Sequence, residues 1–490
     1  MVLKSIQSFG KGDAESDSGL SDFFIETPSY KGIENQKRLV VVGRKGAGKT
    51  AIYEMLLERA ETLWENFFAV GLDFHNYPWA LHDAACSKEE PTADQYASLW
   101  QFLVLVEISK LVLRKGKTRS GREARKARWR LKRFIKLNWG STNARVTQIF
   151  SRSAYRVTLE PGAFGFKLFS LSREKVPREE LASSIPSVNS WIRHALAKLL
   201  DDRSSYFILL DDLDDGFSAS DPAAQSRLIG LLAAARDIRN WAQKEGLRLT
   251  PVVFMRSDIY GALKFSSKNK ITSEIQEKIA WSEAAEDSAS LKRLIEQRIR
   301  AAIGFKTTDP WLEVFADDRI DDVPLYEYMA ARTHRRPRDM IKLANLCLAR
   351  ANARGASKIG SEHVREALQE YSEYLLGELE DPAHQLVTDW NEHVMTIRRL
   401  GRWSFSRAEF EQAHEAGSAG DTCEHALRDL YDFGMIGYAR GNAVVYAHHH
   451  DELIDAAAPR FEVHPGLRPA LKLSAPFSGR GAAGVPQDAG

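Results

Sequence analysis

A glycine-rich stretch near the N-terminus holds the first residues whose types and spacing could do chemistry. Residues 43–50 read GRKGAGKT and match the pattern G-x-x-x-x-G-K-[ST]. Glycines in such a loop let the backbone curl around phosphate groups, and the helix that follows adds its positive N-terminus. We therefore expect a phosphate-binding loop with nucleotide contacts from Gly43, Arg44, Lys45, Gly46, Ala47, Gly48, Lys49, Thr50 and Ala51.

The lysine and the threonine of this loop have separate expected roles. Lys49 should bridge the β- and γ-phosphates of a nucleotide, and the Thr50 hydroxyl should hold Mg²⁺. A glycine-rich turn with a chance lysine is the alternative, and the strand and helix predicted on either side favour the phosphate-binding loop. The guanine-reading motif N-K-x-D does not occur in the sequence, so ATP is expected rather than GTP.

A second set of polar residues follows the apolar run FILL at 207–210. This run predicts a buried strand, and the acidic stretch DDLDD comes directly after it. Because ligands of α/β sheets bind at the carboxyl ends of the strands, we expect Asp211 to hold Mg²⁺, directly or through water. Asp212 is the candidate for polarising the attacking water. Many such ATPases carry glutamate there, so the shorter aspartate predicts slow turnover. Asp214 and Asp215 are expected to form a solvated acidic turn.

Two arginines could respond to the γ-phosphate. Arg256 follows the apolar run VVFM and should lie at the carboxyl edge of the sheet, where a cation can stabilise the charge of the transferred group. A surface ion pair with Asp258 is the alternative. Arg338 follows Pro337 in a basic turn, and because proline is well tolerated in a first helical turn, Arg338 should project from a helix start. A solvated basic turn explains these last residues equally well.

The elements that must position these residues alternate between strands and helices. The strand–turn–helix around residues 39–66 leads into a second strand at 67–74, and such a start implies a parallel sheet. Further strands are expected in YFILLDDLDDGF at 206–217, where the strand ends in acids, and in LTPVVFMRSDIYGAL at 249–263, where the strand runs into a turn. After about residue 285 the pattern is helical almost throughout, and the hairpin MIGYARGNAVVY closes the ordered part of the chain.

The four motifs GRKGAGKT, FILLDDLDD, VVFMRSD and HRRPRDM together resemble a known family. Their order is similar to that of Walker A, Walker B, sensor 1 and sensor 2 in the STAND and origin-recognition side of the AAA+ ATPases. The chain looks in particular like bacterial P-loop ATPases with a G-R-K-G-x-G-K-[ST] loop and a D-D-L-D-D Walker B. The resemblance implies Arg256 as sensor 1 and Arg338 as sensor 2, although arginine stands here at the glycine of the usual G-x-P-R.

The fold class expected on this basis is an α/β P-loop NTPase core, a parallel sheet with helices on both faces, with an α-helical lid and a C-terminal winged-helix-like domain. The distance from Lys49 to Asp211 is 162 positions, more than a compact core needs, which predicts an insertion. The expected organisation is a flexible N-terminus at 1–21, the core at 22–285 with a basic insertion at about 85–185, the lid at 286–384, the winged-helix-like domain at 385–460, and a disordered tail at 461–490.

The insertion is strongly basic in its first half. From Lys110 to Lys136 the sequence has thirteen Lys or Arg residues and one acid, Glu123. With Trp129 and Trp139 as stacking surfaces, residues 110–139 could follow a nucleic-acid backbone. A protein partner, an oligomer contact or a plain solvated face are the alternatives. A β-hairpin is expected at 155–170.

The C-terminal region has weaker signals. The segment DTCEHALRDLYDF at 421–433 contains four acids and one arginine, which argues against insertion into a DNA groove. His448, His449 and His450 are adjacent, and neighbours on a strand point to opposite faces, so they are not expected to share one metal ion.

The composition of the chain indicates the cellular compartment. The net charge is +2, so any basic feature must be local, and the three cysteines have no C-x-x-C pairing, which indicates a reducing compartment. The N-terminus has no signal-peptide pattern, and no transmembrane segment is expected. We predict a cytoplasmic protein.

The sequence predicts an ATP-binding and hydrolysing switch with Mg²⁺ as its metal. It is expected to form homo-oligomers and to regulate a protein partner or a separately encoded effector, since no effector motif is recognisable, with bacterial defence or stress as the setting that the resemblance implies. The alternative is an ATP-dependent nucleic-acid loader or remodeller that uses the basic insertion. A phosphotransferase is a third class, which the lack of an acceptor-binding motif near the loop disfavours.

Overall fold

The computed structural model describes residues 2–17, 19–62, 65–75, 77–86, 91–143, 159–160, 167–168, 178–214, 217–218, 221–266, 268–282, 284–304, 307–417, 420–448 and 452–475. It divides into two compact units. The P-loop unit comprises Phe9–Pro310 and Arg336–Ile341, and the C-terminal unit comprises Met1–Ser8, Trp311–Arg335 and Lys342–Gly490. Each unit is described by itself.

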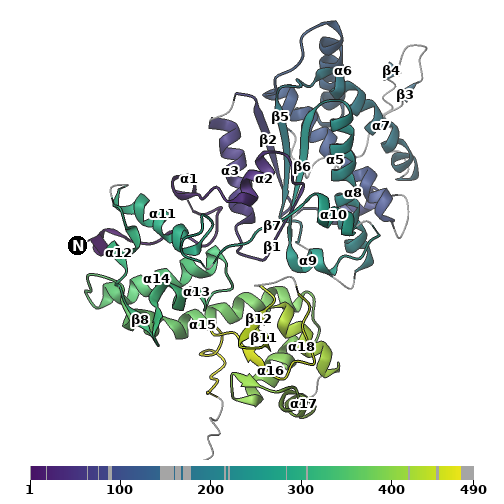
Figure 1. Ribbon diagram of the computed structural model, residues 1–490. Helices are drawn as coiled ribbons and strands as arrows, with labels where there is room; N and C mark the ends of the chain where they lie inside the picture. The colour runs from purple at the N-terminus through teal and green to yellow at the C-terminus, as the bar shows by residue number, and fades with distance from the viewer. Residues whose placement is uncertain are drawn as a thin grey trace, which may run out of the picture. The chain divides into compact units, whose positions relative to one another are not determined.

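The P-loop unit is built on a five-stranded, all-parallel sheet (Figure 1). Its strand order is β2-β5-β6-β1-β7, so β6 lies between the strand before the glycine-rich loop and the strand that ends in acids. The strands are β1 (Val40–Gly43), β2 (Phe67–Asp73), β5 (Ser205–Asp211), β6 (Arg248–Arg256) and β7 (Gln276–Lys278). Because all five run in one direction, the residues that follow β1, β5 and β6 meet at one edge of the sheet.

Helices cover both faces of this sheet, as burial of β1 and β5 along their whole length requires (Figure 1). One face packs on α2 (Pro28–Glu34) and α3 (Lys49–Thr62). The other packs on α5 (Ala93–Arg114) and α8 (Pro222–Lys244). The remaining helices of this unit are α1 (Leu20–Phe23), α4 (Trp79–Ala84), α6 (Arg122–Trp139), α7 (Arg178–Leu199), α9 (Ser257–Ala262), α10 (Lys268–Glu274) and α11 (Leu291–Ile303).

The predicted insertion contains elements of two kinds. Helix α5 contacts β2, β5 and α8, so this part of the segment belongs to the packing of the core. Helix α6 packs on α5 and α7 through a stripe of buried residues that includes Leu131, Phe134 and Ile135, and leaves its basic face exposed. The expected hairpin is seen as β3 (Leu159–Glu160) and β4 (Lys167–Leu168), which pair antiparallel. The other residues predicted for it lie outside the described ranges.

Within the described part of the chain, α5 is the one helix long and apolar enough to cross a membrane by length and composition alone. The protein itself buries 83% of its most apolar stretch. Helix α5 also carries Glu107 and Lys110, which form a buried ion pair. Burial of this kind is typical of a core helix.

The C-terminal unit combines helices with a small antiparallel sheet of strand order β10-β13-β11-β12. The predicted hairpin is confirmed, with Arg440 paired to Ala443 around Gly441. The strands of the sheet are β10 (Ser404–Phe405), β11 (Ile436–Arg440), β12 (Ala443–Tyr446) and β13 (Phe461–Val463), and a separate ribbon is formed by β8 (Arg319–Ile320) and β9 (Val323–Pro324). The helices are η1 (Val2–Ser5), α12 (Pro310–Val314), α13 (Leu325–Ala330), α14 (Pro337–Ala353), α15 (Ser361–His384), α16 (Trp390–Leu400), α17 (Arg407–Glu415) and α18 (Cys423–Asp432); α12 and α14 begin in residues of the P-loop unit.

The predicted fold class, a P-loop core followed by a helical region and a winged-helix-like sheet, is therefore confirmed. The C-terminal tail differs from its expected description. A disordered tail is predicted at 461–490, whereas Phe461–Val463 forms β13, an inner strand of the small sheet. The side chains of Phe461 and Val463 are buried, and Glu462 between them gives the alternation of a short strand. The Pro/Gly-rich composition of the residues that follow outweighs this signal in the sequence.

Candidate nucleotide-binding site

The glycine-rich loop connects β1 directly to α3. Gly46 and Gly48 have φ values of 81° and 99°, a left-handed backbone that side chains disfavour. These two turns let the loop double back, so that α3 begins at Lys49 with its N-terminus facing the loop. This is the backbone shape that a phosphate-binding loop needs.

The side chain of Lys49 lies along this loop. Its Nζ atom donates to the carbonyl oxygens of Gly43 at 3.2 Å and Arg44 at 3.3 Å. Burial lowers the pKa of Lys49, and the negative charge of Asp211 opposes that effect. The ammonium group is therefore desolvated, and the charge of Asp211 neutralises it only in part. An incoming phosphate would be strongly attracted to such a group.

Thr50 and Asp211 form the central contact of the site. The Thr50 hydroxyl donates to Oδ2 of Asp211 at 2.9 Å, although the two residues are 161 positions apart in sequence. Burial raises the pKa of Asp211, and Lys49 opposes this shift. A hydroxyl beside a carboxylate is the oxygen donor set that P-loop proteins use for Mg²⁺, so the residues present fit that ion.

Asp212 has an unusual backbone and a perturbed carboxyl group. Its φ is 56°, in the left-handed region that non-glycine residues seldom adopt. Burial, together with the neighbouring charges of Asp211 and Asp214, raises its pKa to about 7. A carboxyl group that titrates near neutral pH suits general-base chemistry on a water molecule.

Arg256 lies at the end of β6 and pairs in register with Gly43 of β1. It is 6% exposed and donates to Asp214 through Nη1 at 3.1 Å and to Asp258 through Nε at 3.2 Å. The pair with Asp258 is thus present, and a second pair joins Arg256 to the acidic turn after β5. Asp214 therefore has a protein partner rather than solvent alone, and Asp215 lies outside the described residues.

An Arg256→Lys variant should separate a nucleotide role from a purely structural one. Lysine keeps the positive charge but loses the forked geometry of the guanidinium, so we expect ATP hydrolysis to fall by ~10²–10³-fold while ATP binding changes little. Steady-state ATPase assays and equilibrium binding check this. Asp258→Asn removes the ion pair with Asp258 and keeps Arg256. If Arg256 has only a structural role, both variants should lose the same amount of ATP hydrolysis, and this result would contradict a role of Arg256 at the nucleotide.

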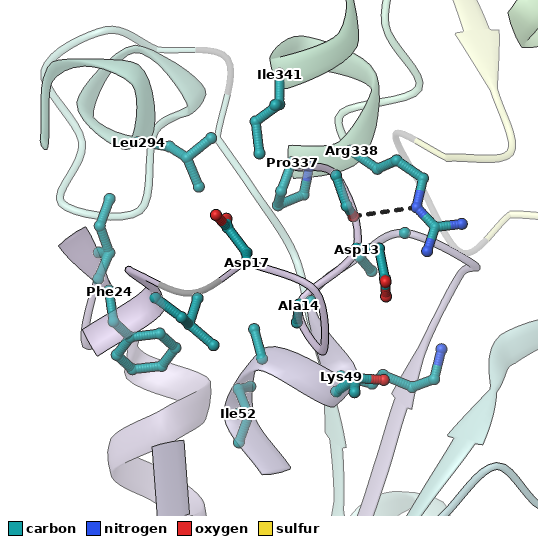
Figure 2. A pocket seen from close by; sticks show the side chains of 18 of the residues that line it. Asp13, Ala14, Asp17, Phe24, Lys49, Ile52, Leu294, Pro337, Arg338 and Ile341 are labelled. Carbon is teal, nitrogen blue, oxygen red and sulfur yellow. Dashed lines mark hydrogen bonds between the residues drawn. The ribbon is translucent and has the colours of Figure 1, made fainter. Parts of the chain in front are cut away.

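The start of α14 lies against the loop. Pro337 occupies the first helical position as expected, and Arg338 lines the same pocket as Lys49 and Thr50. The Nε atom of Arg338 donates to the carbonyl oxygen of Gly12 at 3.2 Å (Figure 2). The structure thus places Arg338 within the site, beside the loop rather than in a solvated turn.

Arg336 is a residue that sequence reasoning missed. It is 4% exposed, forms two hydrogen bonds with Asp339 at 2.8 and 2.9 Å, and donates to the carbonyl oxygen of Lys45 at 3.0 Å. It therefore joins the start of α14 to the phosphate-binding loop. The i,i+3 spacing of Arg336 and Asp339 in RRPRD was the available signal for this buried pair.

Replacing Arg336 with alanine should destabilise the protein. The buried carboxylate of Asp339 would lose its two hydrogen bonds from the Arg336 guanidinium, and breaking a buried ion pair costs about 3–5 kcal/mol in comparable cases. Urea denaturation followed by tryptophan fluorescence measures this loss. Arg350→Ala, on α14, removes an exposed pair with Glu370 and should cost no more than about 1 kcal/mol. Equal losses in the two variants would show that Arg336 does not hold the loop.

The segment before α1 also contributes to the pocket. Asp13 and Ala14 lie on a stretch that crosses the pocket near Arg338 and Lys49 (Figure 2). A buried ion pair between Asp17 and Arg298 of α11, at 2.8 Å, anchors this stretch. The Ser, Gly and Asp content of these residues predicts a flexible N-terminus, whereas this buried ion pair holds the segment on α11.

The remainder of the pocket is lined mainly by apolar side chains. The indole of Trp281 closes one side and donates to the carbonyl oxygen of Ala47 at 2.9 Å. The apolar lining comes from α1 and the residues after it, α3, α11 and α14, and includes Leu20, Phe23, Phe24, Ile25, Ile52, Leu294 and Ile341. A polar phosphate end and an apolar base end therefore meet in one cavity.

Comparison with known proteins adds one family match and several structural likenesses. Residues 289–380 match the FunZ-associated C-terminal helical domain. No curated protein shows a significant match. Among solved structures, the Aeropyrum pernix ORC1 protein in complex with DNA is 16% identical, with 95% of this chain and 97% of that chain covered and a TM-score of 0.39. The Aeropyrum pernix ORC2 protein in its ADPNP–ADP complexes is 15% identical, with 91% of this chain and 89% of that chain covered and a TM-score of 0.40. Cdc6p from Pyrobaculum aerophilum is 13% identical, with 84% of this chain and 83% of that chain covered and a TM-score of 0.28.

These likenesses extend over most of the chain. The likeness to STAND ATPases stays a prediction. Because the TM-scores are below 0.5, the assignment of the P-loop fold rests on the strand order and loop geometry described above.

Proposed function

We propose that this protein binds and hydrolyses ATP with Mg²⁺ and acts as a nucleotide-controlled conformational switch that regulates a partner. The observation that carries this proposal is the 2.9 Å contact between Thr50 and Asp211, because it joins the phosphate-binding loop to the acid that a P-loop ATPase uses for its metal. Mg²⁺ held there would neutralise charge on the phosphates. Lys49 would bind the phosphates, and Asp212 would take a proton from the attacking water.

The lining of the pocket supports a switch rather than a simple phosphatase. A bound nucleotide would contact the loop, the N-terminal segment and the first turn of α14 at the same time. Helix α14 begins within the P-loop unit and continues from Lys342 in the C-terminal unit. A nucleotide that moves the first turn of α14 would therefore change the orientation of the whole helix. Small local shifts become domain movements in this way.

The proposal includes homo-oligomers, a separately encoded effector and a cytoplasmic setting. Light scattering coupled to size-exclusion chromatography tests it with ADP, ATP and a non-hydrolysable ATP analogue. We expect the subunit number or hydrodynamic radius with the analogue to differ from that with ADP, and the wild-type protein to return to the ADP state as ATP is consumed. Identical profiles in all three nucleotides would remove the switch from the proposal.

A second function, an ATP-dependent nucleic-acid loader, is favoured by the exposed face of α6. Trp129 on that face is 57% exposed, and the Arg133 guanidinium lies 5.4 Å from its ring centroid. Other exposed basic residues of the helix are Arg122, Arg125, Lys126, Arg130, Lys132 and Lys136. Exposed aromatic and cationic groups on one helix face suit a stacked base and its phosphate backbone.

Fluorescence anisotropy with labelled single-stranded DNA separates the two functions. The loader predicts binding that weakens steeply with salt, a loss of affinity in Trp129→Ala, and hydrolysis stimulated by DNA. The switch predicts hydrolysis that is indifferent to DNA. Arg248→Ala, on an exposed residue at the start of β6, is the control for a general loss of positive charge.

A further inference from the structure

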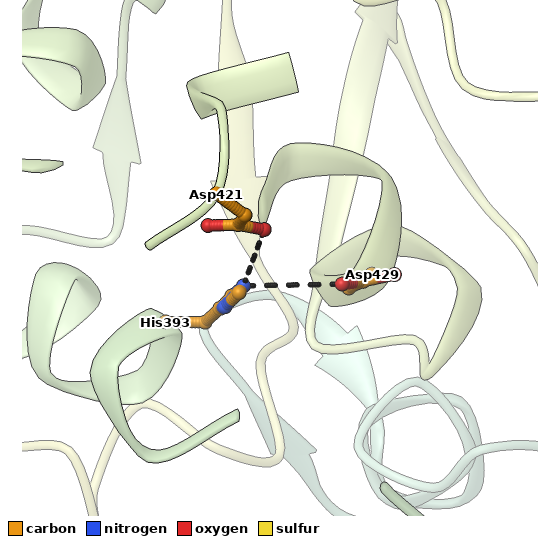
Figure 3. A group of neighbouring side chains, drawn as sticks. All are labelled: His393, Asp421 and Asp429. Carbon is orange, nitrogen blue, oxygen red and sulfur yellow. Dashed lines mark ion pairs between the residues drawn. The ribbon is translucent and has the colours of Figure 1, made fainter. Parts of the chain in front are cut away.

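Four side chains in the C-terminal unit form a compact cluster that the nucleotide site does not use. His393 comes from α16, His414 from α17, Asp421 from the segment before α18, and Asp429 from α18. Figure 3 shows His393, Asp421 and Asp429 pointing toward one another, and their ligand atoms all lie within 4.8 Å of one another. The cluster joins three helices that pack on one another.

The hydrogen bonding of His393 defines which ring nitrogen faces the cluster. Its Nδ1 lies 3.1 Å from the carbonyl oxygen of Asp389, and because a carbonyl can only accept, Nδ1 must carry the proton. In the neutral ring, Nε2 then presents a lone pair. Histidines that bind metals usually donate their other N–H in this way, which sets the tautomer and the ring orientation.

Three polar atoms at the centre of the cluster have no hydrogen-bond partner in the part of the chain that the structure describes. His393 is fully buried, yet its Nε2 has no hydrogen-bond partner among the described residues, and the same holds for Nε2 of His414 and Oδ1 of Asp421. Nε2 of His393 nevertheless lies 3.3 Å from Oδ2 of Asp421 and 3.8 Å from Oδ2 of Asp429. A buried nitrogen lone pair facing two carboxylates is repulsive unless a cation lies between them.

Two cations could relieve this repulsion: a proton on the His393 ring or a metal ion. Two carboxylates, Asp421 and Asp429, face the same His393 nitrogen, so a single proton would compensate only part of their negative charge. A divalent ion would neutralise both carboxylates at once.

We propose that His393, Asp421, Asp429 and His414 form a zinc site in the C-terminal unit. Ligands about 2.0–2.2 Å from a tetrahedral Zn²⁺ lie roughly 3.3–3.6 Å apart. The His393 separations of 3.3 and 3.8 Å, and the 3.5 Å from Nε2 of His414 to Oδ1 of Asp421, are close to this spacing. Two imidazole nitrogens and two carboxylates suit Zn²⁺ better than Mg²⁺ or Ca²⁺, which prefer oxygen alone. The ion would cross-link α16, α17 and α18, a structural role independent of ATP.

The test uses the full-length protein with any affinity tag removed and no nucleotide present. After chelation and dialysis, Zn²⁺ is titrated against a competing chromogenic chelator, and bound metal is measured by mass spectrometry. We expect one Zn²⁺ per chain and a rise in Tm on its addition. Loss of a residue that hydrogen-bonds a metal ligand weakens metal binding roughly 10- to 100-fold. Because His393→Gln removes a ligand itself, it should weaken Zn²⁺ binding by more than this and should remove the rise in Tm.

Two further variants keep this result interpretable. Asp429→Asn changes a partly exposed ligand and should lose Zn²⁺ while the circular dichroism spectrum stays native. His425→Gln, on an exposed residue of the same helix, should bind Zn²⁺ as the wild type does. His448→Gln changes a histidine of the C-terminal unit that lies outside the cluster, and it should bind Zn²⁺ as the wild type does. The proposal is overturned by failure of the wild type to take up Zn²⁺, by equal affinity in His393→Gln, or by loss of binding in His448→Gln alone.

Discussion

Replacing Lys49 with alanine should abolish measurable ATP binding. Its ammonium group lies in the loop with two carbonyl oxygens as partners, and a bound nucleotide would offer phosphate oxygens instead. Two hydrogen bonds to charged groups contribute about 1.5–3 kcal/mol each, so their loss should weaken binding by ~10²–10⁴-fold. Isothermal titration calorimetry with ATP and Mg²⁺ measures this effect.

The Lys49→Ala variant should remain folded, which makes the binding result interpretable. Burial disfavours the charged form of Lys49 in the folded protein, which limits how much stability the side chain contributes, whereas its removal leaves the buried Asp211 without this neighbouring positive charge. Because these two effects oppose each other, we expect a small change in Tm at neutral pH. Lys31→Ala, on an exposed residue of α2, is the control and should bind ATP as the wild type does. Tight ATP binding by Lys49→Ala would contradict the assignment of the phosphate-binding loop.

Asp212→Asn should bind ATP normally and hydrolyse it ~10²–10⁴-fold more slowly, the range expected for loss of a general base. Asparagine suits this position because, like aspartate, it tolerates the left-handed backbone at φ 56°. The variant therefore removes the carboxylate without straining the turn. Unchanged turnover in a single-turnover assay would exclude Asp212 from the catalytic role.

The pH dependence of the wild type follows from the same carboxyl group. With a pKa of about 7, Asp212 becomes an active base only as the pH rises through neutrality, so kcat/KM should increase between about pH 6 and 8. The Asp212→Asn variant should lose this step. A wild-type profile that is flat across this window would show that the group does not act as the base.

Ionisation of Asp212 should lower the stability of the folded protein, whereas it should raise the rate of hydrolysis. Because the folded-state pKa of about 7 is above the ordinary 3.8, the folded protein binds this proton more tightly, and stability falls as the pH rises from about 4 to 7. Asp212→Asn is free of this loss. Its Tm relative to the wild type should therefore be higher at pH 8 than at pH 5, in the absence of nucleotide.

Sequence-based prediction succeeded where the signal is local. The β-branched run before Gly43 and the apolar run before Asp211 predict buried strands, because strands covered on both faces need continuous apolar residues. The glycines and Lys49 predict the loop, because backbone shape and phosphate chemistry depend on a few adjacent residues. The hairpin around Gly441 follows from alternation and a turn glycine in the same way.

The sequence by itself thus determined a parallel α/β core, the location of its phosphate-binding loop and the acids expected to face it. The tertiary structure decided which distant residues meet there. Thr50 contacts Asp211 across 161 positions, Arg336 reaches the loop from α14, and Asp17 anchors the N-terminal segment on α11. It also brought His393 to Asp421 and Asp429, which no motif connects. Such contacts depend on how whole helices and strands pack, and no short motif in the sequence shows which distant residues that packing brings together.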